Sequence, residues 1–417
     1  MGYTGANFSR IAQTIEGTQG EWVYTTTDSA TAFTASNYIT DLNRGLKLGD
    51  TVWVINTSTG QSTQCYVSSV GAAGITLTSV SPPSFGANFR NILDGGDFTT
   101  NPFQRNIPGL ASGGIISSAV TNTATYFADR WFAWGGSSSS ILMAAAADTT
   151  LAGFSQALSV YRTASNTNTA NFNLAQIVET LDTIKLQGQA ITFSFYAKAL
   201  ATYSGGSLTV QVIYGTGTNQ TAANLIAGSW TGQGYVINTT QAITSSYGRY
   251  QFTGTVPATA TQLAVVITWT PTGTASGSTD GINFQGFQLE LGNNASVFEH
   301  RDVQVDLEIC QRYAWVIAEP ASGVQVGIGG ATTTANNQQF YMATPVQMLK
   351  APTVTVSAGS FKVCAAAAAA AATGMAAGST HTPNAIEIVS TLTQTVGLSA
   401  ALQGGGGSGY IVASADF

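Results

Sequence analysis

Apolar and polar residues alternate along many short stretches of this chain, and segments rich in glycine, serine and asparagine separate those stretches. In Leu208-Thr209-Val210-Gln211-Val212, every second side chain is apolar. A period of two places one face of a β-strand against a core and the other in water. The pattern of a strong helix is rare in this sequence, so we predict an all-β fold.

The first unit predicted is a small N-terminal β module at residues 1–90. Strands are expected at 51–55, 64–70 and 75–78, at a spacing typical of a meander or small barrel. The unit ends at Ser81-Pro82-Pro83-Ser84, because consecutive prolines cannot donate hydrogen bonds to a sheet.

The second unit predicted is a jelly-roll β-sandwich at residues 91–301. About eight strands joined by polar loops favour two stacked sheets. The strand at 190–197 has aromatic side chains on both faces and is therefore expected to lie inside a sheet. The predicted strands are 130–134, 141–145, 156–162, 190–197, 207–214, 250–255, 262–269 and 282–291.

Residues 302–315 are expected to form a short helical junction, because Leu307, Cys310 and Tyr313 recur at helical spacing. This junction and the residues before it concentrate charge in a chain that has little elsewhere. A smaller C-terminal β-sandwich is predicted at 316–417, with a flexible glycine-rich turn at 403–409. Its strands are expected at 324–328, 339–343, 353–356, 385–390 and 410–415.

The eight alanines at 365–372 leave their structure open. Alanine favours helix by propensity, whereas the flanking segments resemble strands, so a flat strand or a loop is also compatible. Letters that stand for residues of uncertain identity are a further alternative. No function is assigned to this run.

Composition excludes several classes of function. Of the 417 residues only 8% are charged, against about 25% in an ordinary soluble domain. The formal net charge is −6 and no Lys/Arg cluster occurs, which disfavours nucleic-acid binding. No apolar run reaches the roughly 18 residues of a membrane span, so no membrane insertion is expected. The N-terminus lacks the pattern of a secretory signal, so we expect folding in a cytoplasm.

Residues that could carry chemistry are few. Cys65, Cys310 and Cys364 are far apart, which indicates buried free thiols and neither a disulfide framework nor a zinc site. The two histidines, His300 and His381, have no nucleophile motif beside them. No phosphate-binding glycine motif occurs. We therefore predict no catalytic residues, no metal site and no cofactor.

Acidic pairs keep two alternatives open. Glycan hydrolysis needs two carboxyl groups about 5–10 Å apart, and the central unit contains Asp94, Asp97, Asp129, Asp280 and Glu290. We interpret these acids as turn and edge residues. A structural calcium ion at the 94–97 turn is a minor alternative.

Aromatic side chains are the remaining candidates for ligand contact, because they stack on the C–H faces of sugars. Trp134 is expected on the strand face opposite Trp131. Trp230 lies in a polar glycine-rich segment, where contact with a ligand, contact with another subunit and burial in the core all remain open. The candidate carbohydrate-binding residues are Trp134, Tyr203, Tyr214, Trp230 and Tyr235.

Several motifs, in order along about 220 residues, carry a family resemblance. One is Ala128-Asp129-Arg130-Trp131, and another is Phe298-Glu299-His300-Arg301. The other matching pieces lie at 91–98, 193–199, 288–292 and 307–313. Through them the chain resembles bacteriophage tail-fibre and minor virion proteins, whose jelly roll is similar to carbohydrate-binding modules. Residues 44–52 are similar, more loosely, to short virion-attachment modules.

The resemblance implies a non-enzymatic homotrimer in the virion, exposed on the particle exterior. It implies a tail fibre or tail tip that adheres to host surface polysaccharide, with residues 1–90 bound to other virion proteins. A head fibre or capsid decoration protein with the same modules is the first alternative. A polysaccharide-degrading tailspike is the second. The turn Asp94-Gly95-Gly96-Asp97 departs from the Asn-Gly-Asp form expected of the family, which leaves a calcium site there in doubt.

Overall fold

The structure, a computed structural model, divides the chain into two compact units, Met1–Asn88 and Phe89–Phe417. The fold is all-β, as predicted, with stacked sheets and a few short helices. No helix among the described residues is long and apolar enough to cross a membrane. The finer boundaries at 301, 315 and 316 stay a prediction. The described residues are 8–13, 20–28, 33–42, 45–58, 62–79, 90–100, 104, 115–117, 122–136, 141–277, 279–331, 338–357, 359, 361–365, 368–371, 375–391 and 399–417.

The N-terminal unit is built on one five-stranded sheet with the order β1-β2-β3-β4-β5. The three strands predicted here correspond to β3, β4 and β5, whereas β1 and β2 were not predicted. β2 pairs with β3 in parallel. The strands are β1 (Phe8–Gln13), β2 (Gly20–Thr26), β3 (Thr51–Asn56), β4 (Ser62–Gly71) and β5 (Gly74–Ser79).

Asp50 connects the start of two strands in this unit. Its carboxylate accepts a hydrogen bond from the Gly20 amide at 2.7 Å and another from the Trp22 indole Nε1 at 2.9 Å. Trp22 and Tyr24 then enter a core that also contains Val52 and Val54. The alternating burial of β2 follows its alternating sequence, which is the behaviour that a half-buried strand requires.

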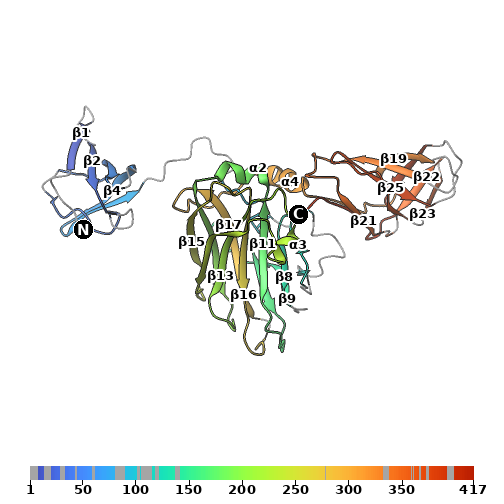
Figure 1. The fold of residues 1–417 in the computed structure, drawn as a ribbon, viewed down its shortest axis with the longest axis horizontal. Helices are drawn as coiled ribbons and strands as arrows, with labels where there is room; N and C mark the ends of the chain where they lie inside the picture. Colours follow the sequence, from blue (N-terminus) through green and yellow to red (C-terminus); the bar gives the residue numbers. More distant parts are fainter. Residues whose placement is uncertain are drawn as a thin grey trace. The chain divides into compact units, whose positions relative to one another are not determined.

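The jelly roll consists of two six-stranded sheets stacked face to face (Figure 1). We call them the first and second sheets, with the orders β15-β12-β17-β10-β9-β6 and β14-β13-β16-β11-β8-β7. The first sheet comprises β6 (Ile115–Ser117), β9 (Ile141–Ala147), β10 (Gln156–Arg162), β12 (Ala190–Ala199), β15 (Gly248–Thr255) and β17 (Asp280–Leu291). The second sheet comprises β7 (Thr125–Tyr126), β8 (Phe132–Gly135), β11 (Phe172–Val178), β13 (Leu208–Gly215), β14 (Gly234–Gln241) and β16 (Gln262–Trp269).

The main core lies between these two sheets and is dominated by aromatic rings. Phe193, Phe195 and Phe287 come from the first sheet and pack against one another, with Phe195 and Phe287 centroids 5.6 Å apart. Trp131 packs on Phe287 at 4.7 Å. All eight predicted strands are present, and β12 lies inside its sheet as expected. β6, β7, β11 and β14 were not predicted.

Short helices cover one end and part of one face of the jelly roll. α2 (Thr180–Thr183), η3 (Ile184–Leu186) and α4 (Val303–Gln311) lie at the same end of the sandwich (Figure 1). α3 (Ala222–Ile226) packs on the outer face of the second sheet through Ala222 and Leu225. α4 lies within residues 302–315, where a short helix was expected. Of the expected stripe, Cys310 and Tyr313 are buried and Leu307 is half-buried.

The C-terminal β-sandwich also confirms its predicted class. A three-stranded sheet, β18-β27-β21, and a seven-stranded sheet, β23-β22-β26-β19-β20-β25-β24, share one core around Phe340, Phe361 and Ile411. The strands are β18 (Ala314–Ala318), β19 (Gln325–Ala331), β20 (Gln338–Ala343), β21 (Thr353–Ser357), β22 (Lys362–Ala365), β23 (Ala368–Ala371), β24 (Ala376–Ala377), β25 (Ala385–Ser390), β26 (Ser399–Gln403) and β27 (Tyr410–Ser414).

Two local features of this sandwich resolve open points. The alanine run contributes to two strands, because Ala365 ends β22 and residues 368–371 form β23, which pairs antiparallel with β22. Residues 366, 367 and 372 lie outside the described residues. The expected flexible turn before β27 is anchored. The Glu319 carboxylate accepts hydrogen bonds from the Gly405, Gly407 and Gly409 amides at 2.8, 3.1 and 2.9 Å.

Candidate functional site

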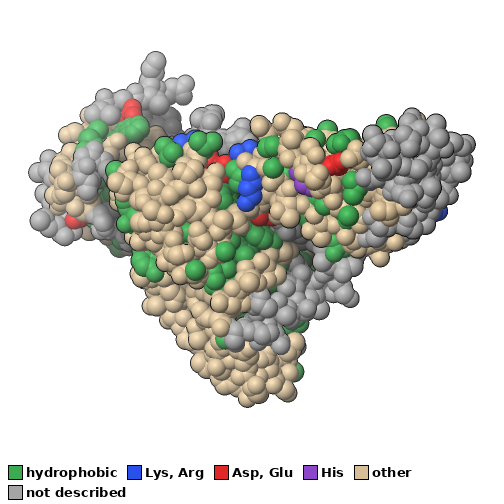
Figure 2. All heavy atoms as spheres, turned by 45° about the vertical axis from the view of Figure 1, so that its right-hand side comes forward, with side chains coloured by type: hydrophobic (Ala, Val, Ile, Leu, Met, Phe, Trp, Pro, Cys, Tyr) green, Lys and Arg blue, Asp and Glu red, His purple; other side chains and the backbone are tan. Residues whose placement is uncertain are grey.

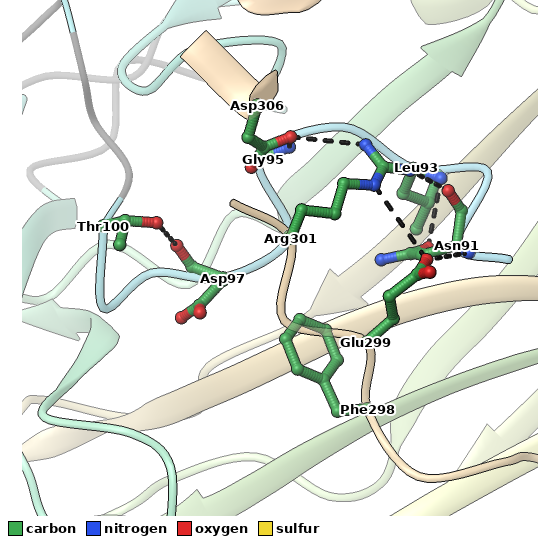
Figure 3. A pocket seen from close by; sticks show the side chains of 10 residues that line it. Asn91, Leu93, Gly95, Asp97, Thr100, Phe298, Glu299, Arg301 and Asp306 are labelled. Atoms are coloured by element: carbon green, nitrogen blue, oxygen red, sulfur yellow. Dashed lines mark hydrogen bonds and ion pairs between the residues drawn. The ribbon is translucent and has the colours of Figure 1, made fainter. Parts of the chain in front are cut away.

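The sequence motifs around Asp94 and Arg301 meet in a small charged recess at one end of the jelly roll (Figure 3). Arg301 donates from Nη1 to Asp94 and to Asp306, at 3.2 Å each. It also donates to the Asn91 carbonyl. The free space among these groups is about 10 Å³, about the room of one water molecule. This recess therefore joins segments of the chain and is too small for a sugar.

The charges of the recess are compensated internally. Arg130, which is almost fully buried, donates from Nε to the second Asp94 oxygen at 3.0 Å. Burial opposes its positive charge, but Tyr313 and Asp94 raise the pKa of Arg130 above its ordinary value. Burial raises the pKa of the Asp306 carboxyl to about 6, against the lowering influence of Arg301. Asp306 is thus the group of this recess whose charge changes just below neutral pH.

The donor set at the 94–97 turn does not fit a calcium ion. Both Asp94 oxygens face guanidinium groups, and Asp97 is bound by the His300 ring Nδ1 at 2.8 Å. A cation there would displace positive charge that the fold already supplies. Among the described residues, no group of three or more His, Cys, Asp or Glu side chains is arranged to hold a metal. His300 is a junction histidine packed against Phe298.

Trp230 was a candidate for ligand contact, and the structure corrects this prediction. Its side chain is only 3% exposed and belongs to the cluster on the outer face of the second sheet. The indole Nε1 donates to the Thr221 carbonyl at 3.1 Å, beside α3. Because α3 and its cap cover the ring, Trp230 serves packing, and a sugar cannot stack on it.

The other four candidate aromatics stay predictions, and the structure does not bring them to one place. Tyr203 stacks on Trp269 at 5.9 Å and donates its hydroxyl to the Gly206 carbonyl. Tyr214 packs half-buried at the edge of the main core. Tyr235 is 50% exposed on β14, at one edge of the second sheet. Trp134 is on β8, near the opposite edge.

The register of the second sheet aligns polar side chains with Trp134. Trp134 pairs with Asn173, which pairs with Thr268, and Thr209 and Thr240 continue the same line. The Thr268 hydroxyl donates to the Asn173 side-chain oxygen at 2.7 Å, so both side chains point the same way. Because Val210 and Ala133 enter the core, this line faces outward. We call these five residues the outer row: Trp134, Asn173, Thr268, Thr209 and Thr240.

The outer row presents hydrogen-bonding groups without charge. Neighbouring strands lie about 4.8 Å apart, so five strands extend the row over roughly 19 Å. The next line on the same face adds Gln211 and Asn238, whose side chains are hydrogen-bonded at 3.0 Å. On the face of the molecule drawn in Figure 2, Lys, Arg, Asp and Glu are likewise sparse among uncharged groups. Hydroxyls, amides and one indole ring are suited to a neutral polar ligand.

The opposite end of the same sheet face is closed. Ile177, Ala264 and Ile213 lie there under Trp230, Leu225 and the C-terminal aromatics of the chain. Tyr313 and Phe417 belong to this cluster, with ring centroids 6.1 Å apart. The segment after α4 therefore packs on the second sheet and closes this part of the face.

Sequence reasoning found Trp134 but missed the other members of the outer row. Asn and Thr are ordinary surface residues in this chain, and Asn173 lies on β11, a strand that was not predicted. An alternating pattern indicates that Thr209 faces away from Val210. The alignment across five strands depends on register, which no local pattern reveals.

Comparisons with known proteins show weak likeness to solved structures. No family model and no curated protein matches the chain. It is similar to the enzymatically active domain of tailspike protein 4 from bacteriophage CBA120, with 11% identity, 49% of this chain and 22% of that chain covered, and a TM-score of 0.30. The CBM22-1 xylan-binding domain of Xyn10C from Paenibacillus barcinonensis gives 16% identity, 44% and 99% coverage, and a TM-score of 0.26.

A third likeness is to TmCBM61 in complex with β-1,4-galactotriose, with 11% identity, 49% and 99% coverage, and a TM-score of 0.27. The alignment with the tailspike spans less than a quarter of that protein. TM-scores at this level carry no argument about what the present chain binds or does.

Proposed function

We propose that this chain is a bacteriophage virion protein, part of a tail fibre or tail tip, that adheres to a neutral glycan on the host surface. The outer row is the observation that carries the binding part of this proposal. It places one half-buried indole and three threonines on one sheet face, around Asn173, which is itself 5% exposed and bonds Thr268. The ordered sequence motifs described above support the virion part.

Glycan binding through the outer row would follow from two contacts. A sugar ring would stack its C–H face on Trp134, and its hydroxyls would exchange hydrogen bonds with the threonines. Asn173 is 5% exposed and would act by holding the Thr268 hydroxyl in place. The absence of charged side chains from these five positions favours a neutral glycan over an acidic one. Each contact is weak, so a multimeric fibre would reach a high overall affinity through avidity. A homotrimer, with residues 1–90 bound to other virion proteins, is part of the proposal.

Adhesion without hydrolysis is supported by the state of the acidic side chains in the jelly roll. Asp280 pairs with Arg162 at 2.7 Å inside the core, and Glu290 bonds Gln288 at 2.7 Å. Asp129 accepts a hydrogen bond from the Gln104 amide at 3.0 Å. These carboxylates support structure, which favours a binding protein over a polysaccharide-degrading tailspike.

Binding is tested by titrating purified full-length protein with neutral polysaccharides from the host surface. We expect Trp134→Ala to weaken binding about tenfold, the equivalent of about 1.4 kcal/mol for one lost aromatic contact. Tyr341→Ala is the control, because Tyr341 is an aromatic residue on β20 of the C-terminal sandwich, 53% exposed and outside the outer row. Equal loss in both variants, or unchanged binding in Trp134→Ala, contradicts the assignment.

The virion assignment is tested separately by imaging whole particles and tracing the chain in them. Three copies at the tail would support the full proposal. Copies on the capsid would assign the chain to a head fibre or decoration protein. Release of oligosaccharides from host polysaccharide by the purified protein would instead support the tailspike alternative.

A further inference from the structure

A lysine, an asparagine and an aspartate meet on the outer face of the first sheet, away from the outer row. Lys198 on β12 and Asn283 on β17 are direct cross-strand partners. Opposite residues in an antiparallel pair have Cβ atoms about 4.5–5.5 Å apart, so the two side chains emerge together. Asp148 directly follows β9 and reaches the same place.

One carboxylate oxygen touches both nitrogen atoms of this cluster. Asp148 Oδ2 lies 2.6 Å from Lys198 Nζ and accepts a hydrogen bond from Asn283 Nδ2 at 3.3 Å. The Tyr247 hydroxyl donates to the same oxygen at 3.1 Å, and its ring lies 4.6 Å from Nζ. The amine, the amide and a proton acceptor are thus held in contact by the fold.

The cluster is shielded from water. The Asp148 side chain is 5% exposed and that of Lys198 is 22% exposed, while Asn283 is 6% exposed. The Asn283 side-chain oxygen is buried and has no hydrogen-bond partner. Buried polar atoms are normally paired, so an unpaired carbonyl beside a lysine calls for an explanation.

We propose that Lys198 and Asn283 form an intramolecular isopeptide bond, with Asp148 as the proton carrier. Lysine amines and carboxyl groups are established participants in nucleophilic and acid–base steps. Burial alone would raise the pKa of Asp148, but its hydrogen bonds with Lys198, Thr150 and Asn283 lower it, so Asp148 starts as the carboxylate. Here Lys198 and Asn283 come from neighbouring strands of one folded sheet, and Asp148 comes from the segment directly after β9. The reaction therefore needs the native fold and no second protein.

The step balances without an oxidant or a co-reactant. Asp148 takes a proton from the Lys198 ammonium, and the neutral amine attacks the Asn283 side-chain carbonyl carbon. The new Nζ–Cγ bond forms as the Cγ–Nδ2 bond breaks. Asp148 carries two protons in all from Nζ to the leaving nitrogen, which departs as ammonium, and Asp148 returns to its carboxylate form.

Tyr247 has a place in the same step. Its hydroxyl lies beside both Asp148 and Asn283. A hydroxyl at this position can turn to donate to the carbonyl oxygen as negative charge develops there. The product would link two inner strands of the sheet and close the chain between residues 198 and 283, which suits a protein exposed to proteases and mechanical load.

Intact mass spectrometry of the denatured full-length protein tests the proposal. We expect the folded wild-type chain to be lighter than its sequence by one ammonia, and peptide mapping to find a branched peptide that joins residues 198 and 283. Lys198→Arg and Asp148→Asn should both keep the full sequence mass. Lys185→Arg is the control, since this lysine is exposed and paired with Asp182.

The mass of the wild-type protein shows whether the bond has formed, even where a variant folds poorly. Circular dichroism establishes which samples are folded. An unaltered mass in folded wild type after prolonged incubation overturns the proposal. Loss of water with a bond from Lys198 to Asp148 overturns the assignment of Asn283 as the acceptor. Loss of ammonia that persists in Lys198→Arg shows a different reaction elsewhere and also overturns it.

Discussion

Replacing Glu179 tests whether the segment after α4 is locked onto the jelly roll. Glu179 lies at the end of β11 and is 5% exposed. Its carboxylate accepts hydrogen bonds from Arg312 Nε at 2.7 Å, from Arg312 Nη2 at 3.1 Å and from the Tyr313 hydroxyl. The change Glu179→Gln keeps the shape of the side chain and removes its charge.

The expected loss follows from these contacts. Hydrogen bonds to a buried charged group contribute about 1.5–3 kcal/mol each. The Arg312 side chain is 35% exposed, so solvent screens its part, and we take the lower end for it. The variant should therefore lose about 3 kcal/mol of unfolding free energy, roughly equally from the Arg312 and Tyr313 contacts.

The assay is urea unfolding of the full-length chain, following the transition of the Phe89–Phe417 unit. A double-mutant cycle with Arg312→Met isolates the pair, and we expect a coupling energy of about 1.5 kcal/mol. Lys185→Met is the matched control, because its ion pair with Asp182 is exposed and should contribute little. Costs of Glu179→Gln and Arg312→Met that simply add would refute the reasoning.

The same variant has a pH signature. Burial alone would raise the pKa of Glu179, but Arg312 and Tyr313 outweigh it and hold the pKa below its ordinary value of 4.5. A lowered carboxyl pKa gives stability that is present above the ordinary pKa and is lost as pH falls through the folded value. The difference between wild type and Glu179→Gln should thus shrink as the pH falls below 4.5.

Three further changes probe other parts of the structure. Arg162→Met leaves the buried Asp280 carboxylate without its guanidinium and should cost about 3–5 kcal/mol in urea unfolding, with Arg162→Met/Asp280→Asn recovering part of that loss. Asp306→Asn should be as stable as wild type near pH 4 and more stable by up to about 3 kcal/mol at pH 7. The reason is that a raised carboxyl pKa makes the wild type lose stability as the pH rises through about 6. A difference in stability that does not change with pH would contradict this. Glu319→Ala removes the carboxylate that accepts hydrogen bonds from three backbone amides, so the melting temperature of the variant should fall. Added formate should recover more of the lost melting temperature than added chloride does, because these amides form an anion-binding nest. Equal effects of the two salts would argue against such a nest.

Strands with an alternating or largely apolar sequence were predictable, and β11, in which buried polar residues interrupt the apolar run, was not. The predicted strands at 156–162 and 262–269 coincide with β10 and β16. β11 is buried along its whole length, yet it contains Asn173 and Gln176, which break the apolar run. These polar side chains are accommodated by partners distant in sequence, such as the Asp94 carbonyl that accepts from Gln176 Nε2 at 2.7 Å.

Residue type alone could not tell which aromatic side chains are accessible. Trp230 lies among glycine and polar residues, which are typical of an exposed loop, and its burial depends on α3, which folds back over it. Trp134 was selected correctly as facing away from Trp131, since strand alternation is local information. The outer row needed the register of five strands, and the Lys198 cluster needed the pairing of β12 with β17, which are far apart in sequence.

The scarcity of charge and its placement have one physical explanation. Arg130, Arg162 and Arg301 are buried or nearly so, and each bonds a carboxylate that lies far from it in sequence. Breaking a buried ion pair is costly, so these pairs fix which segments meet even where they add little net stability. The exterior can then consist largely of hydroxyl and amide groups. These groups bind a ligand through short-range hydrogen bonds and produce no long-range electrostatic field. A surface of this kind selects its ligand by hydrogen-bond geometry, and that is the property the outer row would require.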